Sequence, residues 1–241
     1  MKKIIYCGDS PVGGPANYLL GILQTLPLHF VHVPPSRDLS PLAVDRCDAV
    51  ILSDYWKNRV SARAEEKIRS MVVDRKGGLL MVGGWGSYTG LNAGWSGSII
   101  ESLLPVRCLK KDDRRNVWTG LLVNRRQKHL ILKGLPESNF PVLCGLNEVL
   151  LRKDADLVLS AKELKSADGH IGFAGREYPL LALSKKFRTA ALTTDLAPHW
   201  CGGWVDWGTE RVVLPVKGSI QVEIGRYYLR FVQNLITWLL G

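Results

Sequence analysis

The sequence predicts a doubly wound α/β fold: a mostly parallel sheet with helices on both faces and an antiparallel extension in the second half. In residues 1–105, short apolar segments alternate with segments of helical periodicity, as in successive βαβ units. The second half carries several short strand-like segments with few helices between them, which favours antiparallel pairing. With 241 residues, 46% of them hydrophobic, the chain is long enough for one domain with a sizeable core, spanning residues 1–241.

The first half contains strands and helices in turn, each bounded by glycine, proline or polar residues. Strands are predicted at residues 3–7, 30–33, 49–52 and 79–82, and helices at residues 16–26, 61–74 and 97–104. Ser61 is a typical N-cap for the second helix, and Pro105 ends the third. The strand at 79–82 is apolar on both faces, as expected of a central parallel strand covered by helices.

The second half contains a run of strands and one long helix. Strands are predicted at residues 116–123, 130–132, 148–152, 157–160, 180–184 and 189–193. Residues 223–240 place Ile224, Tyr228, Phe231 and Leu235 on one broad apolar face, which predicts a closing amphipathic helix.

The termini and the cysteines favour a cytoplasmic protein. Two lysines precede only four or five apolar residues at the start, too few for a signal-peptide core of about 7–15. The apolar segment 231–240 is interrupted by Gln233 and Asn234 and falls well short of the ~20 residues that span a bilayer, so no membrane segment is expected. Five scattered cysteines without a CxxC pair argue against a disulfide framework.

The remaining histidines and the basic residues suggest neither a metal nor a nucleic-acid site. His29, His32, His129 and His170 form no ligand spacing, so we expect no metal and no other cofactor. The net charge is +10, and a basic stretch runs through residues 107–128 but is broken by acidic residues. We interpret it as a solvated edge strand guarded by charge rather than a nucleic-acid surface.

Polar or glycine-rich turns follow four of the predicted parallel strands. Ligands of open α/β sheets bind outside the carboxyl ends of the strands, so these turns are the candidate site. The residues selected for ligand binding are Asp9, Ser10, Asp54, Gly83, Gly84, Trp85, Gly86, Asp195 and Trp200. The turn from Val82 to Ser87 resembles a nucleophile elbow, but it contains no cysteine, and a glycine-rich connection chosen for tight packing explains the pattern equally well.

Three segments carry a more specific resemblance. GLLMVGGWGSYTG at 78–90, ESLLPV at 101–106 and TDLAPHW at 194–200, together with Gly8-Asp9-Ser10, resemble the glutamine amidotransferase-like family of the class I superfamily. The resemblance spans almost the whole chain. It implies a flavodoxin-like fold and one class I glutamine amidotransferase-like domain.

The resemblance also implies which catalytic residues to look for. A class I glutaminase uses a cysteine nucleophile at the elbow, a histidine base and an acid two residues after that histidine. Here the elbow centre is Gly84 or Trp85, His199 matches the histidine, and Cys201 stands in the place of the acid. Without the nucleophile the covalent route is lost, so we predict no glutaminase activity and leave open whether another catalytic activity remains.

Two rearranged catalytic arrangements are conceivable. In an extended segment, His199 and Cys201 would lie on the same face, with Asp195 or Asp206 orienting the imidazole and Cys201 as nucleophile. Ser87 is the other stand-in nucleophile. The alternative is that both are packing residues and His199 alone acts as a base near neutral pH.

Six of the eight tryptophans fall at or near the predicted ligand-facing turns: Trp56, Trp85, Trp95, Trp200, Trp204 and Trp207. Indoles beside carboxylates suit sugars or other flat small molecules, although tryptophan more often fills a core or a subunit interface. Some superfamily relatives, of the trehalose-utilisation type, also lack the cysteine and are linked to carbohydrate metabolism, so the resemblance allows such a role here.

Two functional hypotheses remain. The first is a protein that binds or hydrolyses a small polar molecule, such as a sugar or an amide, with the glycine-rich turn donating backbone amides to an oxyanion or carboxylate. The second is a non-catalytic interaction module on a degenerate amidotransferase fold, forming a homo-oligomer through its tryptophans or its long C-terminal helix. Neither hypothesis requires a membrane.

Overall fold

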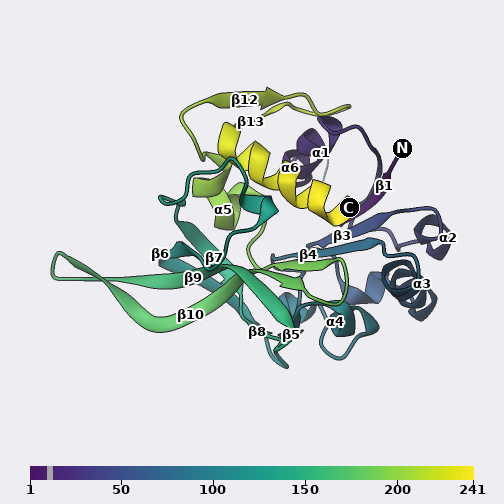
Figure 1. Cartoon of the computed structure of the whole chain (residues 1–241), viewed down its shortest axis with the longest axis horizontal. Helices are drawn as coiled ribbons and strands as arrows, with labels where there is room; N and C mark the ends of the chain where they lie inside the picture. Colours follow the sequence, from purple (N-terminus) through teal and green to yellow (C-terminus); the bar gives the residue numbers. More distant parts are fainter. Residues whose placement is uncertain (10–12) are drawn as a thin grey trace.

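A computed structural model describes residues 1–9 and 13–241, and its centre is a nine-stranded sheet (Figure 1). Five parallel strands form one part, in the order β2-β1-β3-β4-β11. Their bounds are β1 Lys3–Gly8, β2 His29–Val33, β3 Ala49–Ser53, β4 Gly78–Val82 and β11 Thr189–Leu192. Counted along the parallel part, this is the 2-1-3-4-5 order of flavodoxin-like folds, so the predicted fold class is confirmed.

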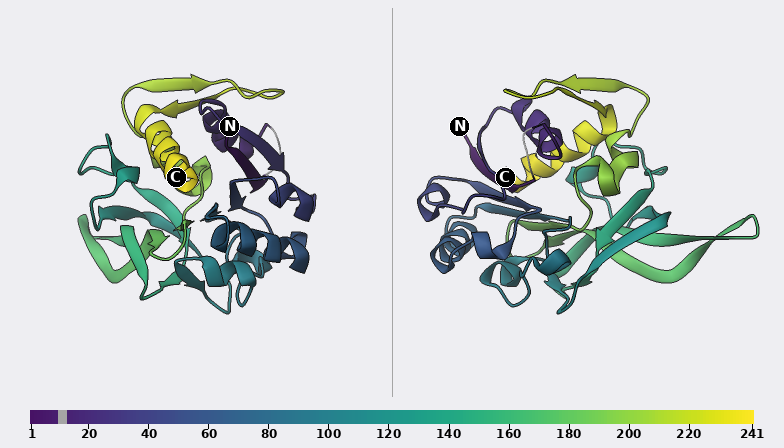
Figure 2. Two further views of the ribbon diagram at one scale, coloured as in Figure 1. Left: turned by 45° about the vertical axis from the view of Figure 1, so that its right-hand side comes forward. Right: turned by 180° about the vertical axis from the view of Figure 1, so that it is seen from behind.

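Helices cover both faces of the parallel strands, as Figure 2 shows. One face carries α1 (Ala16–Gln24) and α6 (Arg226–Leu240), and the other carries α2 (Pro41–Val44), α3 (Ala62–Val73) and α4 (Ile99–Leu103). Alternate residues of β1 enter opposite hydrophobic cores: Ile4 packs with the α1 and α6 side, and Ile5 packs with the α3 side. Ser61 caps α3 by accepting a hydrogen bond from the Ala64 amide, as predicted.

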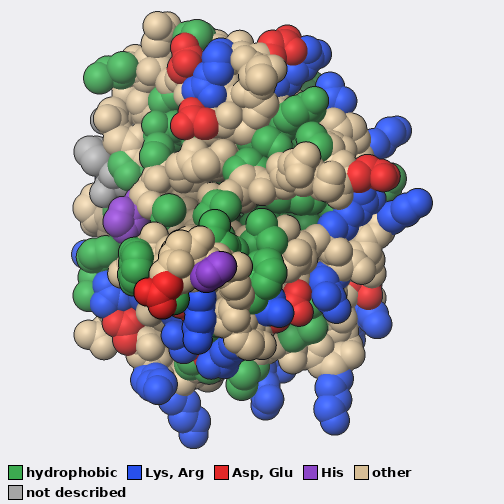
Figure 3. All heavy atoms as spheres, turned by 90° about the vertical axis from the view of Figure 1, so that its left-hand side faces the viewer, with side chains coloured by type: hydrophobic (Ala, Val, Ile, Leu, Met, Phe, Trp, Pro, Cys, Tyr) green, Lys and Arg blue, Asp and Glu red, His purple; other side chains and the backbone are tan. Residues whose placement is uncertain are grey.

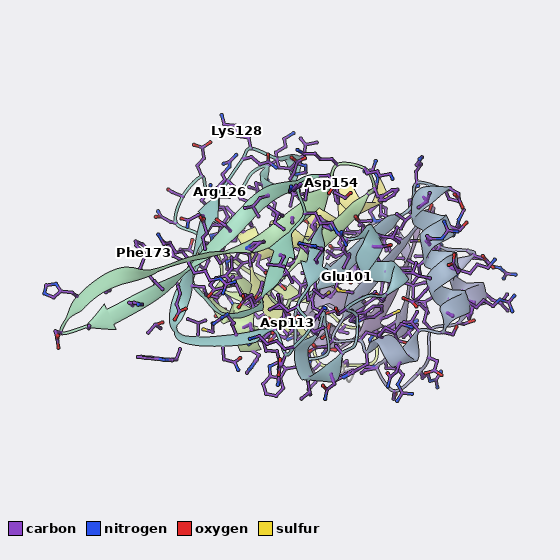
Figure 4. All side chains as sticks on the ribbon, turned by 90° about the horizontal axis from the view of Figure 1, so that it is seen from below. Glu101, Asp113, Arg126, Lys128, Asp154 and Phe173 are labelled. Carbon is purple, nitrogen blue, oxygen red and sulfur yellow. The ribbon has the colours of Figure 1, made fainter. Side chains whose placement is uncertain are left out.

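The antiparallel extension continues the same sheet beyond β11. Its strands are β10 (His170–Ser184), β9 (Ala155–Ala167), β6 (Arg114–Arg125) and β7 (Leu143–Asn147). β9 and β10 run past the end of their neighbour β6 as a two-stranded hairpin that projects from the body of the molecule and carries Phe173 (Figure 4).

Smaller elements complete the fold. Two short sheets pair β5 (Val106–Cys108) with β8 (Val149–Leu151) and β12 (Arg211–Leu214) with β13 (Val222–Gly225). The remaining helix is α5 (Pro198–Val205), and the 3-10 turns are η1 (Lys57–Arg59), η2 (Gly90–Asn92) and η3 (Leu130–Leu132).

Several local predictions were wrong. Residues 130–132 form a 3-10 turn instead of a strand, because the His129 ring accepts the Ile131 amide at 3.2 Å and starts a turn. Residues 223–225 belong to β13, and α6 begins only at Arg226. Helix α5 was not predicted, because its two adjacent glycines have low helix propensity.

The basic segment does not guard a sheet edge. Strand β6, which carries most of it, lies between β9 and β7. Arg114 pairs with Asp112, and Arg115 pairs with Glu148. On the face seen in Figure 3, Lys and Arg side chains stand among Asp and Glu. In the described parts of the chain, no helix has both the length and the apolar character needed to cross a membrane.

Candidate functional site

The carboxyl ends of β1, β3, β4 and β11 surround a cleft of about 400 Å³. Five of the residues selected from the sequence line it: Asp9, Asp54, Trp85, Asp195 and His199. Pro15 and Ala197 add apolar wall. The parallel sheet therefore gathers three carboxylates, an imidazole and an indole from segments far apart in the sequence.

Asp9 follows β1 and is buried at the bottom of the cleft. The Tyr6 hydroxyl donates a 2.6 Å hydrogen bond to its Oδ2. Burial, reinforced by the negative charge of Asp54, raises the pKa of Asp9 to about 7. The preceding Gly8 has φ +110°, and a Cβ there would lie 1.5 Å from the Ser53 carbonyl oxygen, so only glycine allows β1 and β3 to approach this closely.

Asp54 follows β3 and is half-buried. Its Oδ1 accepts the Gly86 amide at 2.6 Å. Burial raises the pKa of Asp54, while the Gly86 hydrogen bond and the nearby His199 act in the opposite direction.

The elbow turn has no room for a side chain at Gly84, one of the two candidate positions for its centre. Gly84 has φ +151°, and a Cβ added there would lie 2.2 Å from Asp54 Oδ1. The carboxylate of Asp54 thus occupies the space into which a side chain at Gly84 would project. A cysteine at this position would require Asp54 to move.

The glycine amides of the turn are already used within the protein. Gly83 donates to the Leu192 and Thr194 carbonyls at 2.7 and 3.0 Å. Gly84 donates to Asn147 Oδ1 at 2.8 Å, and the Gly86 amide is held by Asp54. The expectation that these three amides face an oxyanion is therefore wrong for this conformation of the turn.

Asp195 follows β11 and is buried against α5. Its Oδ2 accepts the Trp200 amide at 3.2 Å. Its Oδ1 is buried and has no hydrogen-bond partner among the residues that the structure describes. Burial, with smaller contributions from Asp9 and Asp54, raises the pKa of Asp195 to about 8.

His199 and Cys201 point in different directions because their segment is helical rather than extended. Residues two apart on a helix are separated by about 200° around its axis. His199 is exposed and its ring meets the edge of Trp85, with 5.6 Å between ring centroids. Cys201 is fully buried and donates to the Ala197 carbonyl at 3.1 Å. Burial raises the pKa of the Cys201 thiol, which opposes formation of a nucleophilic thiolate.

Other selected residues have contacts within the protein. Ser87 is buried, and its Oγ accepts the Asp54 amide at 3.0 Å. Trp200 is buried and donates from its indole to Asn116. Asp206 pairs with Arg211, 2.8 Å away, and is not among the residues lining the cleft. Ser10 lies outside the described residues.

Most of the tryptophans singled out in the sequence are core residues. Trp95, Trp200, Trp204 and Trp207 are buried. The Trp56 ring packs against Gly86, where an added Cβ would lie 2.8 Å from it. Among the tryptophans of the described residues, Trp85 alone lines the cleft, with 42% of its surface exposed.

Sequence reasoning missed the residues that hold the turn in place. Asn147, at the end of β7, accepts the Gly84 amide and donates both to the Gly84 carbonyl and to Asp113 Oδ1. Asp113, labelled in Figure 4, accepts both the amide and the hydroxyl of Thr89 through its Oδ2. Arg114 stacks on Trp85 at 4.8 Å. The pair of aspartates that breaks the basic stretch was the one sequence signal pointing here.

Comparisons with known proteins agree with this architecture. Residues 43–216 match the family model GATase1_like, described as "Putative glutamine amidotransferase". Two cytoplasmic proteins of Salmonella typhimurium, STM3548 and STM1381, have similar structures with TM-scores of 0.73 at 22% and 21% identity, each match covering 98% of both chains. The N-terminal domain of mmIFT52 has a TM-score of 0.61 at 12% identity, over 99% of this chain and 97% of that one. These structural likenesses concern the fold. No curated protein sequence matches significantly.

Proposed function

This chain belongs to the glutamine amidotransferase-like family, and we propose that it lacks glutaminase activity and instead binds or hydrolyses a small polar molecule, such as a sugar or an amide, in the carboxylate cleft. One observation carries the proposal: the Asp54 carboxylate, beside Asp9, occupies the space that an elbow side chain would need. We place this activity in one domain of residues 1–241, because strands from both halves share one sheet. We also propose a cytoplasmic location, which the five free cysteines favour.

The two carboxylates suit acid–base chemistry because their environments differ. The buried Asp9, with a pKa of about 7, is partly protonated at neutral pH. Asp54 is less buried and is stabilised as an anion by the Gly86 amide and by His199. In a hydrolysis, Asp54 accepts a proton from the attacking water and Asp9 gives a proton to the leaving group, so the protons balance.

His199 stands at the rim rather than on the floor of the cleft. Its exposed ring, braced by Trp85, is placed to contact a ligand or to act as an additional base. Neither Cys201 nor Ser87 has a part in the proposed chemistry, because both are buried and hydrogen-bonded within the protein.

The test combines an assay of glutamine hydrolysis with a screen of amide and glycoside substrates. We expect no ammonia release from glutamine, and turnover or binding of a screened compound that falls at least tenfold in Asp54→Asn. Glu137→Gln, which removes an exposed carboxylate lining no part of the cleft, is the matched control. Glutamine-dependent ammonia release by the purified protein, or full activity in Asp54→Asn, would contradict the proposal.

A second candidate function, a non-catalytic interaction module, is favoured by the projecting hairpin. Ile171 and Phe173 on β10 are 78% and 52% exposed, and Trp118 on β6 is 91% exposed. The tryptophans near the cleft and the apolar face of α6 are largely buried within the chain, so the hairpin is the better contact surface for association. Light scattering tests this candidate: a strict monomer at micromolar concentration counts against self-association.

A further inference from the structure

Three carboxylates converge in the cleft without a basic partner. None of Asp9, Asp54 and Asp195 has a lysine or arginine within ion-pair distance among residues 1–9 and 13–241. Their hydrogen-bond donors are neutral: the Tyr6 hydroxyl and the Gly86 and Trp200 amides. Only the exposed His199 lies close enough to offset part of this charge.

Two of the other buried acids have basic partners. Glu148 forms ion pairs with Arg115 and Arg176, and Glu65 forms one with Lys57 at 2.9 Å. Asp113 has neutral donors only, but both of its oxygens are occupied. Glu65 Oε1 and Asp195 Oδ1 are both buried without a hydrogen-bond partner, but Glu65 has Lys57 on its other oxygen. The cleft differs because Asp195, which is 8% exposed and lines the cavity, has no lysine or arginine within ion-pair distance among the described residues.

A buried carboxylate without a basic partner is costly as an anion, so it either binds a proton, as the raised pKa values of Asp9 and Asp195 indicate, or takes a cation from outside the chain. The missing partner must carry hydrogen-bond donors and positive charge. It must also fit a cleft of about 400 Å³ whose remaining walls are Trp85, Pro15 and Ala197. A primary ammonium group on a small, partly apolar or ring-shaped body meets all of these requirements.

We infer that the small polar molecule bound in this cleft carries a protonated amine, held by the carboxylates of Asp54 and Asp195 with its body against Trp85. The inference rests on the proposed function and names the chemical class of its ligand. An uncharged polyol supplies hydrogen-bond donors but no positive charge to balance the negative charge of the carboxylates. Among the described residues, no group of three or more His, Cys, Asp or Glu is placed to hold a metal ion, so the three carboxylates do not form one coordination site.

Matched probes that differ only in the amine test the inference. Isothermal titration at low salt compares 1,4-diaminobutane with 1,4-butanediol, and glucosamine with glucose. We expect at least one amine to bind tenfold or more tightly than its hydroxyl counterpart, and to lose most of that affinity as salt rises.

The site is assigned by the variants Asp54→Asn and Asp195→Asn, which keep the shape of the side chain and remove its charge. Each should weaken amine binding at least tenfold, whereas Glu137→Gln should leave it unchanged. Circular dichroism confirms that each variant is folded, and Asp9→Asn replaces any variant that is not.

The outcomes separate this inference from the proposed function. If neither amine binds better than its hydroxyl counterpart, or if amine binding survives in both variants, the amine inference is wrong. Turnover of an uncharged amide or glycoside that is lost in Asp54→Asn would then leave the proposed function standing.

Discussion

Two acidic regions of this molecule, the surroundings of Glu148 and the cleft, differ in whether their buried carboxylates have basic partners. Around Glu148, two arginines close on one carboxylate, and both guanidinium groups also lie over the Tyr178 ring. In the cleft, Asp9 and Asp195 are as buried as Glu148 but have neutral donors only. Glu65 and Glu148 thus have basic partners, whereas the described residues supply none to the three carboxylates that line the cleft, and this is one reason to treat the cleft as the candidate site.

The largest expected effect tests how much the Asp195 carboxylate, which has no basic partner, lowers the free energy of unfolding. The pKa of Asp195 is raised from about 4 in the unfolded chain to about 8 in the folded protein, so the folded state binds the extra proton between these values. Stability of the wild type should therefore fall as pH rises from 4 through 8. Asp195→Asn removes this titration and should be more stable than wild type at pH 8.5 by roughly 2–5 kcal/mol, and close to wild type near pH 4. Urea unfolding at the two pH values measures the difference, and parallel pH profiles would contradict it.

The next effect tests the crowding of the elbow by Asp54. Gly84→Ala places a Cβ against Asp54 Oδ1 at a strained φ, so we expect a loss of roughly 2–4 kcal/mol in unfolding free energy. Gly97→Ala is the control, because its φ of +78° is also positive but nothing lies within 4 Å of the added Cβ. It should cost only about 1 kcal/mol, which is the backbone strain alone. Equal losses would show that Asp54 does not crowd the turn.

A smaller effect is expected at the compensated acid. Glu148→Gln leaves two arginines facing a neutral amide, but both arginine side chains are about half exposed and remain partly solvated. We expect a loss of about 1–2 kcal/mol and a drop in Tm of roughly 2–8 °C for a chain of this size. A gain in stability at high pH, as predicted for Asp195→Asn, would remove the contrast between the two regions.

The smallest expected effect concerns the reactivity of the cysteine thiols, and its test needs no substitution in the core. Cys144 is exposed, whereas Cys201 and the other three thiols are buried. A thiol reagent such as DTNB should label one cysteine rapidly in the native protein at neutral pH, and Cys144→Ser should abolish that rapid phase. Rapid labelling of Cys201 would instead restore it as a candidate nucleophile.

Much of the fold was predictable because its signals are local. The strands at β1, β3 and β4 are short apolar segments ended by polar or glycine residues, and Ser61 caps α3 as its sequence predicts. The errors occur where partners distant in sequence decide the conformation. Residues 223–225 continue an apolar helical pattern, yet they pair with β12 as a strand. The hairpin of β9 and β10 extends well beyond the apolar segments 157–160 and 180–184, from which its strands were predicted.

The candidate site, too, has features that the sequence predicted and features that it did not. Asp9, Asp54, Trp85, Asp195 and His199 could be selected because parallel strands bring their carboxyl ends to one edge of the sheet. The separation of His199 from Cys201 could not be predicted from the sequence, because it depends on helix α5. The support of the turn by Asn147 could not be predicted either.

The sequence by itself determined the doubly wound fold, the position of the candidate site and the absence of a cysteine at the elbow, since these follow from periodicity and residue identity. Only the tertiary structure decided that the Asp54 carboxylate stands where an elbow side chain would project and that the turn's glycine amides are already occupied. It also decided that three acids line one cleft with no basic partner among residues 1–9 and 13–241. Charge compensation is a property of distances between segments remote in sequence, which no local pattern encodes.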